Sequence, residues 1–423
     1  MKSVILRFLM STLLLAGCAS ANAATMDITA SFSPSMENPE NNTFTNTTKQ
    51  SGYCSADPGE CIENNVFSIS MGEITASLAT SGIIANSTPR MGMYYKMPGA
   101  WRNVTATNKD TGSQVTISFR ANAFSAQYNT NGDWTLTKYG EAWNGGSFVY
   151  APSPCGYSGV GKYTPKFYMF MWKWPISDAA CYKTATKDLT GEPYLISDTS
   201  LGYELKTPDP LKMESGIYTG RLALRVGPGG DIDFGDNFQA SDNELDINFT
   251  LTVNHELKLT TTPENRAVSL QPCAPGRICS EEEGSANWER WMVNRITPEL
   301  TGKSNFNLSS SGEFTVYLQC EQQSGSDCAL KSDNTPSQTV PVRTLLTLPE
   351  NIIDHSTGST VSKRRLTTGK DLTKNVFTTK SFGQNRAGSI EFLVGQKDVD
   401  TMLKTRPDTY RGAVTVIFDP DIY

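Results

Sequence analysis

The sequence YRGAVTVIFDPDIY, residues 410–423, decides the fold of this 423-residue chain. Two sets of residues alternate along it as far as Phe418, and a period of two is typical of a β-strand with one face in a core. Pro420 interrupts the residues after Phe418, so we expect no further strand there. The residues expected on one face of the strand are Tyr410, Gly412, Val414, Val416 and Phe418.

A second copy of this pattern lies in mid-sequence. Tyr218-Thr219-Gly220 begins an alternating run that ends at Val226, a turn-rich segment spans residues 227–230, and another alternating run spans residues 245–253. The mid-sequence copy therefore has a hairpin partner, whereas the carboxyl-terminal copy has only a proline-interrupted tail after it. We predict two β-domains, the first closed and the second one strand short.

An absent strand has a large expected effect on stability. A strand of about ten residues contributes roughly five inward side chains at ~1.5–3 kcal/mol each, which is comparable to the ~5–15 kcal/mol net stability of a domain. The open edge also leaves unpaired backbone groups beside an apolar groove, a template for the strand of another chain. We expect the second domain to need a partner. The alternative is that residues 340–348 supply the closing strand.

Charge, length and cleavage chemistry predict a secretory signal peptide over residues 1–23. Two basic residues accompany an apolar run, 8–16, and Ala21-Asn22-Ala23 supplies a small-residue cleavage site. The alternative is a lipoprotein, because Leu15-Ala16-Gly17-Cys18 resembles a bacterial lipoprotein processing site. After cleavage 35 basic and 43 acidic residues remain. This net charge of −8 disfavours nucleic acid or an anionic membrane as a partner.

The nine cysteines leave eight without Cys18, an even number that suits an oxidising compartment. They fall into four couples that are close in sequence, and nearest-neighbour pairing is the simplest of the 105 connectivities open to eight cysteines. A metal site is disfavoured because there are only two histidines and no two cysteines stand two residues apart. We expect no cofactor. The expected disulfides join Cys54 to Cys61, Cys155 to Cys181, Cys273 to Cys279, and Cys320 to Cys328.

Short alternating segments separated by polar turns recur along the sequence, and this density of strands indicates β-sandwiches. Helical periodicity is scarce, with one expected helix over residues 286–296. We place the first domain at residues 24–253 and the second at 254–423, joined nearly end to end by Asn254-His255-Glu256. The clearest expected strands span residues 66–71, 115–119, 134–137, 167–174, 203–205 and 314–318.

Three stretches resemble the CfaE/CblD-like minor tip adhesins of alternate chaperone–usher (class 5) fimbriae. They are Ser215–Val226, Leu245–Val253 and Tyr410–Pro420, and the resemblance is clearest over residues 194–262 and 408–420. It implies two immunoglobulin-like domains, an adhesin domain followed by a pilin domain. It also implies secretion through the periplasm to the tip of a fimbrium on the bacterial surface.

The resemblance also implies the partners of such a subunit. A periplasmic chaperone would lend a strand to the pilin domain, and the N-terminal extension of the major pilin subunit would later replace that strand at the outer-membrane usher. The adhesin domain would bind a host-surface glycan or glycoprotein. These implications agree with the open second domain expected from the strand pattern.

The receptor pocket of the family is basic and lies on the adhesin domain. Arg90-Met91 is similar to an Arg-Met pair of that pocket, and a guanidinium beside aromatic rings suits acidic or sialylated sugars. A second basic cluster of the family follows the strand that ends at Arg225-Val226, but residues 227–231 contain no base here. The expected ligand contacts are Arg90, Tyr94, Trp101, Arg102 and Arg225.

Several of these residues have simpler interpretations. Arg90 and Arg102 can be solvated loop charges. An alternating aromatic stripe can be sandwich core instead of a sugar platform; its members are Tyr168, Phe170, Trp172 and Trp174. The runs Glu281-Glu282-Glu283 and Lys363-Arg364-Arg365 are expected on solvated turns of the pilin domain.

An enzyme is not expected. Serine-type catalysis needs a histidine poised near neutral pH, and neither His255 nor His355 adjoins a nucleophile motif. No pair of carboxylates is singled out for glycoside cleavage. The alternatives to a receptor-binding tip subunit are a structural tip subunit that initiates assembly without a receptor, and a surface-anchored lipoprotein with closed domains.

Overall fold

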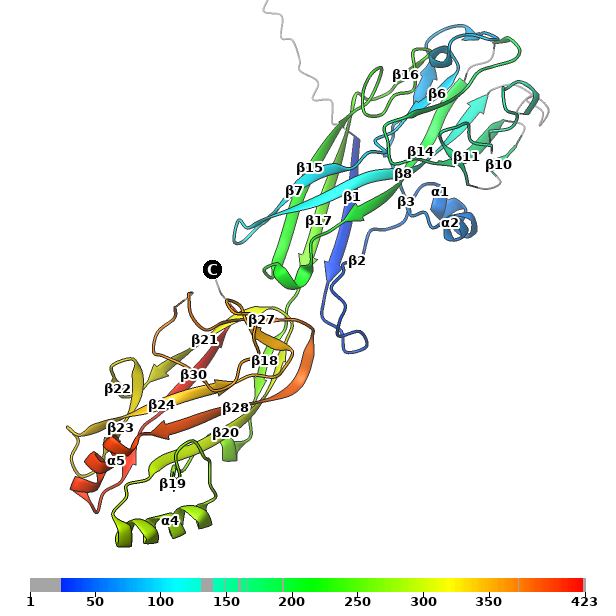
Figure 1. The fold of residues 1–423 in the computed structure, drawn as a ribbon. Helices are drawn as coiled ribbons and strands as arrows, with labels where there is room; N and C mark the ends of the chain where they lie inside the picture. The colour runs from blue at the N-terminus through cyan, green and yellow to red at the C-terminus, as the bar shows by residue number, and fades with distance from the viewer. Residues whose placement is uncertain are drawn as a thin grey trace, which may run out of the picture.

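The computed structural model describes residues 24–420, apart from 131–139, 149, 159–160, 165, 192–193 and 372. The expected signal peptide, Cys18 and the strand expected at 134–137 lie outside the described residues. Strands dominate the rest, in two domains that lie one beyond the other in an elongated molecule (Figure 1). The prediction of an all-β chain with two immunoglobulin-like sandwich domains in tandem is confirmed.

One sheet of thirteen described strands builds most of the first domain. Its main path runs β16-β4-β14-β8-β7-β15-β17-β1-β2, and β3, β9, β10 and β11 join at its side. Most buried side chains from strands along this path belong to one large hydrophobic core, so the sheet folds over on itself. Ala123 of β8 belongs to a smaller cluster with Cys54 and Cys61. Its strands are β1 (Ala24–Phe32), β2 (Thr45–Asn46), β3 (Ser68–Ser70), β4 (Ala76–Leu78), β7 (Arg102–Asn108), β8 (Gln114–Thr130), β9 (Gly156–Tyr157), β10 (Lys162–Tyr163), β11 (Phe167–Lys173), β14 (Tyr194–Lys206), β15 (Gly216–Arg225), β16 (Phe238–Ala240) and β17 (Glu244–Val253). Two small ladders complete the domain: β5 (Gly82–Ile83) with β13 (Leu189–Thr190), and β6 (Met93–Lys96) with β12 (Ala180–Lys183).

The hairpin expected after Tyr218-Thr219-Gly220 is present. β15 and β17 pair antiparallel from Gly216↔Val253 to Arg225↔Glu244, and β1 lies on the other side of β17 as a parallel neighbour. β17 is therefore an interior strand. Its apolar inward residues are at most 1% exposed; they are Leu245, Ile247, Phe249, Leu251 and Val253.

The aromatic stripe of β11 belongs to the core. Its four rings, from Tyr168 to Trp174, are at most 4% exposed, and the indole N–H of Trp172 donates to the carbonyl oxygen of Phe148 at 2.6 Å. The core interpretation is confirmed, and these rings are not available to a sugar.

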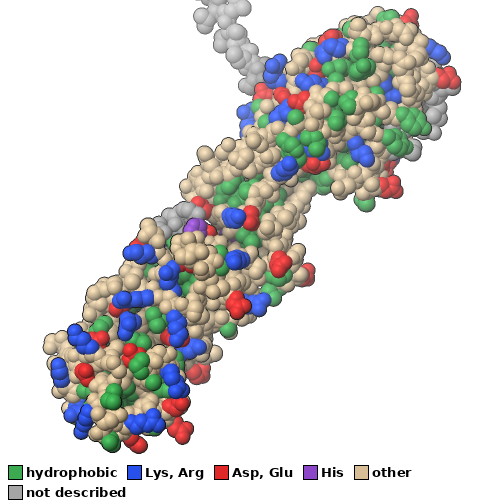
Figure 2. Space-filling model, viewed as in Figure 1, with side chains coloured by type: hydrophobic (Ala, Val, Ile, Leu, Met, Phe, Trp, Pro, Cys, Tyr) green, Lys and Arg blue, Asp and Glu red, His purple; other side chains and the backbone are tan. Residues whose placement is uncertain are grey.

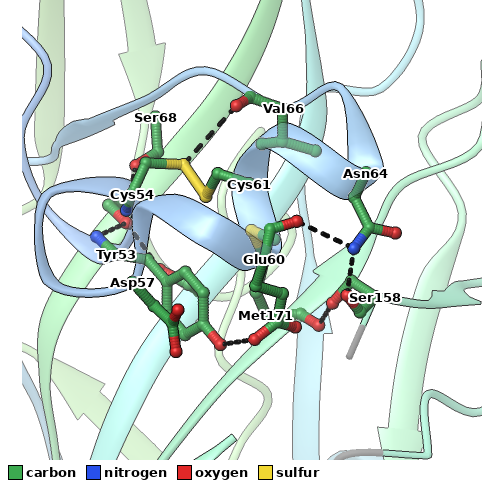
Figure 3. The surroundings of a disulfide bond; sticks show 12 residues. Tyr53, Cys54, Asp57, Glu60, Cys61, Asn64, Val66, Ser68, Ser158 and Met171 are labelled. Carbon is green, nitrogen blue, oxygen red and sulfur yellow. Dashed lines mark hydrogen bonds between the residues drawn. A yellow bond between two sulfur atoms is a disulfide. The ribbon is translucent and has the colours of Figure 1, made fainter. Parts of the chain in front are cut away.

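A disulfide-linked helical hairpin packs on the first domain (Figure 3). Helices α1 (Tyr53–Ala56) and α2 (Pro58–Asn64) are joined by the buried Cys54–Cys61 bond. The hydroxyl of Tyr53 donates to Glu60, and the side-chain amide of Asn64 donates to the carbonyl oxygen of Ser158. Sequence periodicity missed both helices because each is too short to show a full helical repeat.

Two sheets enclose the second hydrophobic core. The nine-stranded sheet has the order β18-β20-β28-β24-β23-β22, with β19, β26 and β29 at its side, and the four-stranded sheet has the order β25-β27-β21-β30. The strands are β18 (Leu257–Thr260), β19 (Gln271–Cys273), β20 (Glu299–Ser310), β21 (Glu313–Cys320), β22 (Gln323–Ser324), β23 (Asp327–Ser332), β24 (Thr339–Thr347), β25 (Ile352–Asp354), β26 (Arg364–Arg365), β27 (Val376–Thr379), β28 (Gly383–Val394), β29 (Tyr410–Arg411) and β30 (Val414–Asp419). The helices are α4 (Glu281–Asn294) and α5 (Gln396–Met402), and short 3-10 turns span Pro89–Met91, Pro210–Lys212, Pro263–Asn265 and Leu403–Thr405.

Most residues of the two charge runs expected on solvated turns belong to regular elements instead, and Lys363 lies in a bend. Glu281-Glu282-Glu283 forms the first turn of α4, where a capping box joins Ser280 and Glu283 and negative charge suits the helix dipole. Arg364 and Arg365 form β26, which pairs with β24. The predicted helix at 286–296 exists, but it begins five residues earlier, at its cap.

The four disulfides have the nearest-neighbour pairing expected from the sequence. Cys155–Cys181 ties the segment before β9 to β12, and Cys320–Cys328 ties the end of β21 to β23. Cys273–Cys279 closes the turn between β19 and α4. Each bond braces a local turn or ladder within one domain.

The joint between the domains is held by contacts on both sides. The backbone N–H of Asn254 donates to Phe32 at 2.9 Å, and that of Ser311 donates to the carbonyl oxygen of Glu256 at 3.0 Å. A loop of the first domain also reaches the second, because the N–H of Phe382 donates to the carbonyl oxygen of Pro39 at 2.7 Å. The domains are therefore connected by more than the covalent chain.

Candidate functional site

β30 is an edge strand. It pairs antiparallel with β21, from Thr315↔Asp419 to Cys320↔Val414, and with no other strand among the described residues. Its second edge therefore has no strand partner there. β24 contains most of the segment considered as an alternative closing strand, but it pairs with β23, β26 and β28 in the other sheet. That alternative is wrong.

The inward side chains of β30 are only partly covered. Val414, Val416 and Phe418 pack against the core but remain half-buried. The ring of Phe418 lies 5.4 Å from the ring of Phe306 and 6.0 Å from that of Phe314, measured between centroids. In β15, the first-domain copy of this sequence pattern, Tyr218 and Leu224 are buried, as is Val226 just after the strand, and Leu222 is half-buried. The same sequence pattern is thus mostly buried in one domain and half-buried in the other.

β18 lies across the core from β30. Its one strand partner among the described residues is β20, and β20 contributes the Phe306 ring that contacts Phe418. On β18, Leu257 is half-buried and Leu259 is 41% exposed. We call β30 together with Leu257 and Leu259 the open edge. It combines an unpaired strand edge with apolar side chains that another strand could cover.

The stretch Tyr410–Phe418 is not one continuous strand. β29 pairs with β23 in the larger sheet, whereas β30 pairs with β21 in the smaller one. The chain changes sheets at Gly412, where a Cβ atom would lie 2.6 Å from the carbonyl oxygen of Ala329. Tyr410 and Gly412 therefore lie outside the open edge, and the single strand expected over residues 410–418 is two strands in different sheets. Donor contacts at Tyr410 and Gly412 stay a prediction.

The first domain lies against one end of the open edge. A hollow of about 550 Å³ at the joint is lined by residues of both domains, among them Ser215, Leu257 and Pro420. In the same hollow, Nε2 of His255 lies 2.8 Å from the carbonyl oxygen of Met213. Burial lowers the pKa of His255 below its ordinary value.

Arg90, the first expected ligand contact, lies between two carboxylates. Its Nη1 donates to Asp233 at 3.0 Å, and its Nε and Nη2 donate to Asp236 at 2.9 and 2.7 Å. Hydrogen bonds to Asp236 and Asp233 raise the pKa of Arg90. The guanidinium also lies 4.7 Å from the ring centre of Tyr94. Donors that would bind an acidic sugar are therefore occupied by the protein's own carboxylates.

Arg102 has a similar environment, and Arg225 does not. Nη2 of Arg102 lies 2.8 Å from Asp178 and 3.3 Å from Asp231. The side chain of Arg225 is exposed and forms no ion pair with a described residue, while its backbone N–H donates to Asp231 at 3.1 Å. Arg225 is thus the expected contact whose guanidinium remains open to a ligand.

Trp101 is half-buried beside cations of its own domain. Nζ of Lys206 lies 4.0 Å from the centre of its ring, and the guanidinium carbon of Arg120 lies 5.6 Å away. Arg120 is held by Glu204 at 2.6 Å. Cation–π contacts of this kind already cover part of the ring.

The structure brings the three expected arginines to one loop, residues 227–236. Asp231, Asp233 and Asp236 of this loop contact Arg90, Arg102 or the backbone of Arg225. The sequence-based prediction used the absence of a basic residue at 227–231 and overlooked these three acidic residues. Their position just after Arg225 was the available signal. Ligand binding by Arg90, Tyr94, Trp101, Arg102 and Arg225 stays a prediction.

Two further searches cover only the part of the chain that the structure describes. No group of three or more His, Cys, Asp and Glu side chains there is arranged to hold a metal ion. None of the described helices has the length and apolar character to cross a membrane.

Comparisons with known proteins give similarity in structure only. No protein-family model and no curated protein matches the sequence. One similar solved structure is a chaperone–tip adhesin complex of CFA/I fimbriae, with 11% identity, 95% of this chain and 97% of that chain covered, and a TM-score of 0.24. Another is CfaE, the adhesive subunit of CFA/I fimbria of enterotoxigenic Escherichia coli. It has 10% identity, 94% of this chain and 92% of that chain covered, and a TM-score of 0.22.

A third is the CsuC–CsuE chaperone–tip adhesion subunit complex of archaic Csu pili of Acinetobacter baumannii. It has 12% identity, 94% of this chain and 98% of that chain covered, and a TM-score of 0.21. These identities and TM-scores are too low to place the chain in a family.

Proposed function

We propose that this chain is a fimbrial tip adhesin whose second domain accepts a strand from another protein. The observation that supports the proposal is that β30 has one strand neighbour among the described residues and half-buried inward side chains, whereas its counterpart in the first domain, β15, lies between β7 and β17 and has mostly buried inward side chains. Strand addition to an open sheet edge is an established recognition mode, of which chaperone–pilin complementation is an example.

The partners follow from this mode of recognition. A periplasmic chaperone supplies the strand first, and the N-terminal extension of the major pilin subunit replaces it at the outer-membrane usher. The donor covers Val414, Val416 and Phe418 of β30 and Leu257 and Leu259 of β18. The subunit then stands at the fimbrium tip on the bacterial surface.

The first domain binds a host-surface glycan or glycoprotein in this proposal. Arg225 is the expected contact with an open guanidinium, and Tyr94 and Trp101 supply rings. A glycan array probed with residues 24–253 tests receptor binding. Binding that Arg225→Ala weakens supports the proposed site, and an array without binding favours the second candidate.

The second candidate is a structural tip subunit that initiates assembly without a receptor. It is favoured by the engagement of Arg90 and Arg102 with Asp233, Asp236 and Asp178. In that case fimbriae that carry this chain at the tip form in normal number. They adhere to host cells no better than fimbriae whose tip subunit lacks the first domain.

Strand acceptance is tested by co-expression of the full chain with the periplasmic chaperone of the same fimbria. A stable one-to-one complex is expected, and hydrogen exchange at β30 should slow when the chaperone is bound. A chain that purifies as a stable monomer and does not bind the chaperone would contradict the proposal.

A further inference from the structure

The carboxyl-terminal end of α4 and the residues just beyond it expose three large apolar side chains. Met292 is 55% exposed, Val293 is 87% exposed and Ile296, just beyond the helix, is 69% exposed. Among the described residues of the second domain, Leu259 on the open edge is the other exposed large apolar residue. A cluster of this kind on a folded domain marks an interaction surface more often than an isolated exposed residue does.

α4 is held firmly in place, so the exposure does not reflect a loose helix. The side-chain amide of Asn287 donates to the carbonyl oxygen of Pro272 on β19 at 2.8 Å. A Cβ atom at Gly284 would lie 2.5 Å from the side chain of Gln271, which shows how closely helix and strand pack. The capping box at Ser280 and the Cys273–Cys279 disulfide fix the start of the helix.

The direction of β30 places α4 at the accessible end of the open edge. β30 begins at Val414, opposite Cys320 at the end of β21, and it finishes at Asp419, next to the joint with the first domain. β20 begins at Glu299, a few residues after α4, and runs toward the joint. Figure 1 shows α4 and α5 at the end of the second domain that lies away from the first.

A terminal extension that fills the open edge therefore brings its folded body to this end. The opposite end is occupied by the first domain, whose Ser215 lines the hollow with Pro420. A strand rises about 3.3 Å per residue, so the six residues of β30 span a short distance. The donor's body must then sit close to α4.

Three arginines lie on α4 or beside its Trp291, which precedes the exposed apolar residues in the sequence. Arg295 and Arg406 lie 5.2 and 5.4 Å from the ring centre of Trp291, and Arg290 donates to Asn287. Within the described residues none of these three arginines forms an ion pair with a carboxylate. A partner surface with an apolar centre and an acidic rim would complement this one.

We propose that Met292, Val293 and Ile296 form a docking surface for the folded body of the subunit whose extension fills the open edge. This inference rests on the proposed function and adds a second contact to it. The open edge binds the N-terminal extension of the donor subunit, and α4 orients the folded body of the same subunit.

The test uses the full chain with a donor peptide tethered to its carboxyl terminus, so that the open edge is already filled. The probe is the major pilin subunit of the same fimbria, self-complemented and lacking its N-terminal extension. Binding is measured by biolayer interferometry with the wild type and with the triple variant Met292→Asp, Val293→Asp, Ile296→Asp. Ile62→Asp is the matched control, since Ile62 is 79% exposed on α2 of the first domain.

The triple variant is expected to weaken binding of the pilin body by about tenfold or more, while Ile62→Asp leaves it unchanged. Equal binding by wild type and triple variant, or no binding by the wild type up to about 1 mM, would overturn the inference. Because the three side chains are exposed, thermal unfolding should be the same in all variants. Failure of the tethered peptide to stabilise the second domain would instead contradict the proposed function.

Discussion

Arg90 contributes to the stability of the first domain through ion pairs with Asp233 and Asp236. A ligand that bound its guanidinium would have to break these ion pairs. Asp233 is 1% exposed and depends on Arg90 for an ion pair, whereas Asp236 lies near the surface. A buried carboxylate without its partner is strongly destabilising. The side chain of Arg90 is 33% exposed, and this exposure reduces the effect.

We therefore predict that Arg90→Ala lowers the stability of residues 24–253 by about 2 kcal/mol. Arg225→Ala should leave stability unchanged because its side chain is exposed. Urea unfolding of the two variants checks this. An unchanged midpoint for Arg90→Ala would show that the two carboxylates do not depend on this arginine.

We predict that His255 makes the joint sensitive to acid. Nε2 faces the carbonyl oxygen of Met213, which can only accept, so Nε2 carries the proton and Nδ1 accepts from the hydroxyl of Ser311 at 3.3 Å. Glu313 is the nearby charge that opposes the effect of burial. Burial nevertheless lowers the pKa of the folded state, so protonation favours the unfolded state.

The full contribution of His255 to stability is accordingly expected above its unfolded pKa of about 6.5. That contribution declines as pH falls through the folded pKa. Thermal unfolding of the full chain between about pH 7.5 and 5 should show a larger decrease for the wild type than for His255→Gln, which cannot titrate. A parallel decrease in both proteins would exclude His255 as the cause.

β30 and β15 share a sequence pattern but differ in their neighbours. β15 lies between β7 and β17, and β30 lies beside β21 alone among the described strands. Alternation predicted both strands, because it depends only on which face of a strand meets a core. It could not predict the change of sheets at Gly412, where the chain passes close to the carbonyl oxygen of Ala329.

Local sequence patterns also failed to predict the short helices and the long-range ion pairs. α1, α2 and α5 are too short to show a helical repeat. The contacts of Arg90 with Asp233 and Asp236 join residues about 145 positions apart, and a pattern in sequence does not show such pairs. The disulfides were predictable because each joins cysteines that are nearest neighbours in the sequence.

The open edge predicts a difference between two neighbouring substitutions on β30. Val416 faces the core beside the expected donor, and Thr415 is exposed on the opposite face. Val416→Asp places a carboxylate in the donor interface, where burial of an unpaired charge is unfavourable. The tethered donor should therefore raise the melting temperature of Thr415→Asp as much as that of the wild type, and that of Val416→Asp by less than half as much.

Equal stabilisation of the two variants would contradict this placement of the donor. The measurement is thermal unfolding of residues 254–423 with and without the tethered donor, followed by circular dichroism. The comparison controls for the added charge, because both variants introduce the same carboxylate on the same strand.

The whole molecule combines a closed first domain with an open second one. Figure 2 shows that Lys and Arg side chains gather on the visible face of the second domain. Several basic residues of the second domain are paired with more buried carboxylates, as in Arg365–Asp327 at 2.7 Å and Lys363–Glu391 at 3.0 Å. Such surface pairs contribute little to stability. They do not replace the apolar cover that the open edge lacks.

Donor-dependent stability of the second domain is the most direct test. Residues 254–423 are expressed alone and with a donor peptide from the major pilin tethered to the carboxyl terminus. Closing the open edge adds on the order of 10 kcal/mol, so the tethered form should unfold cooperatively and roughly 20 °C or more above the untethered form. An untethered fragment that is monomeric, cooperatively folded and equally stable would contradict the account.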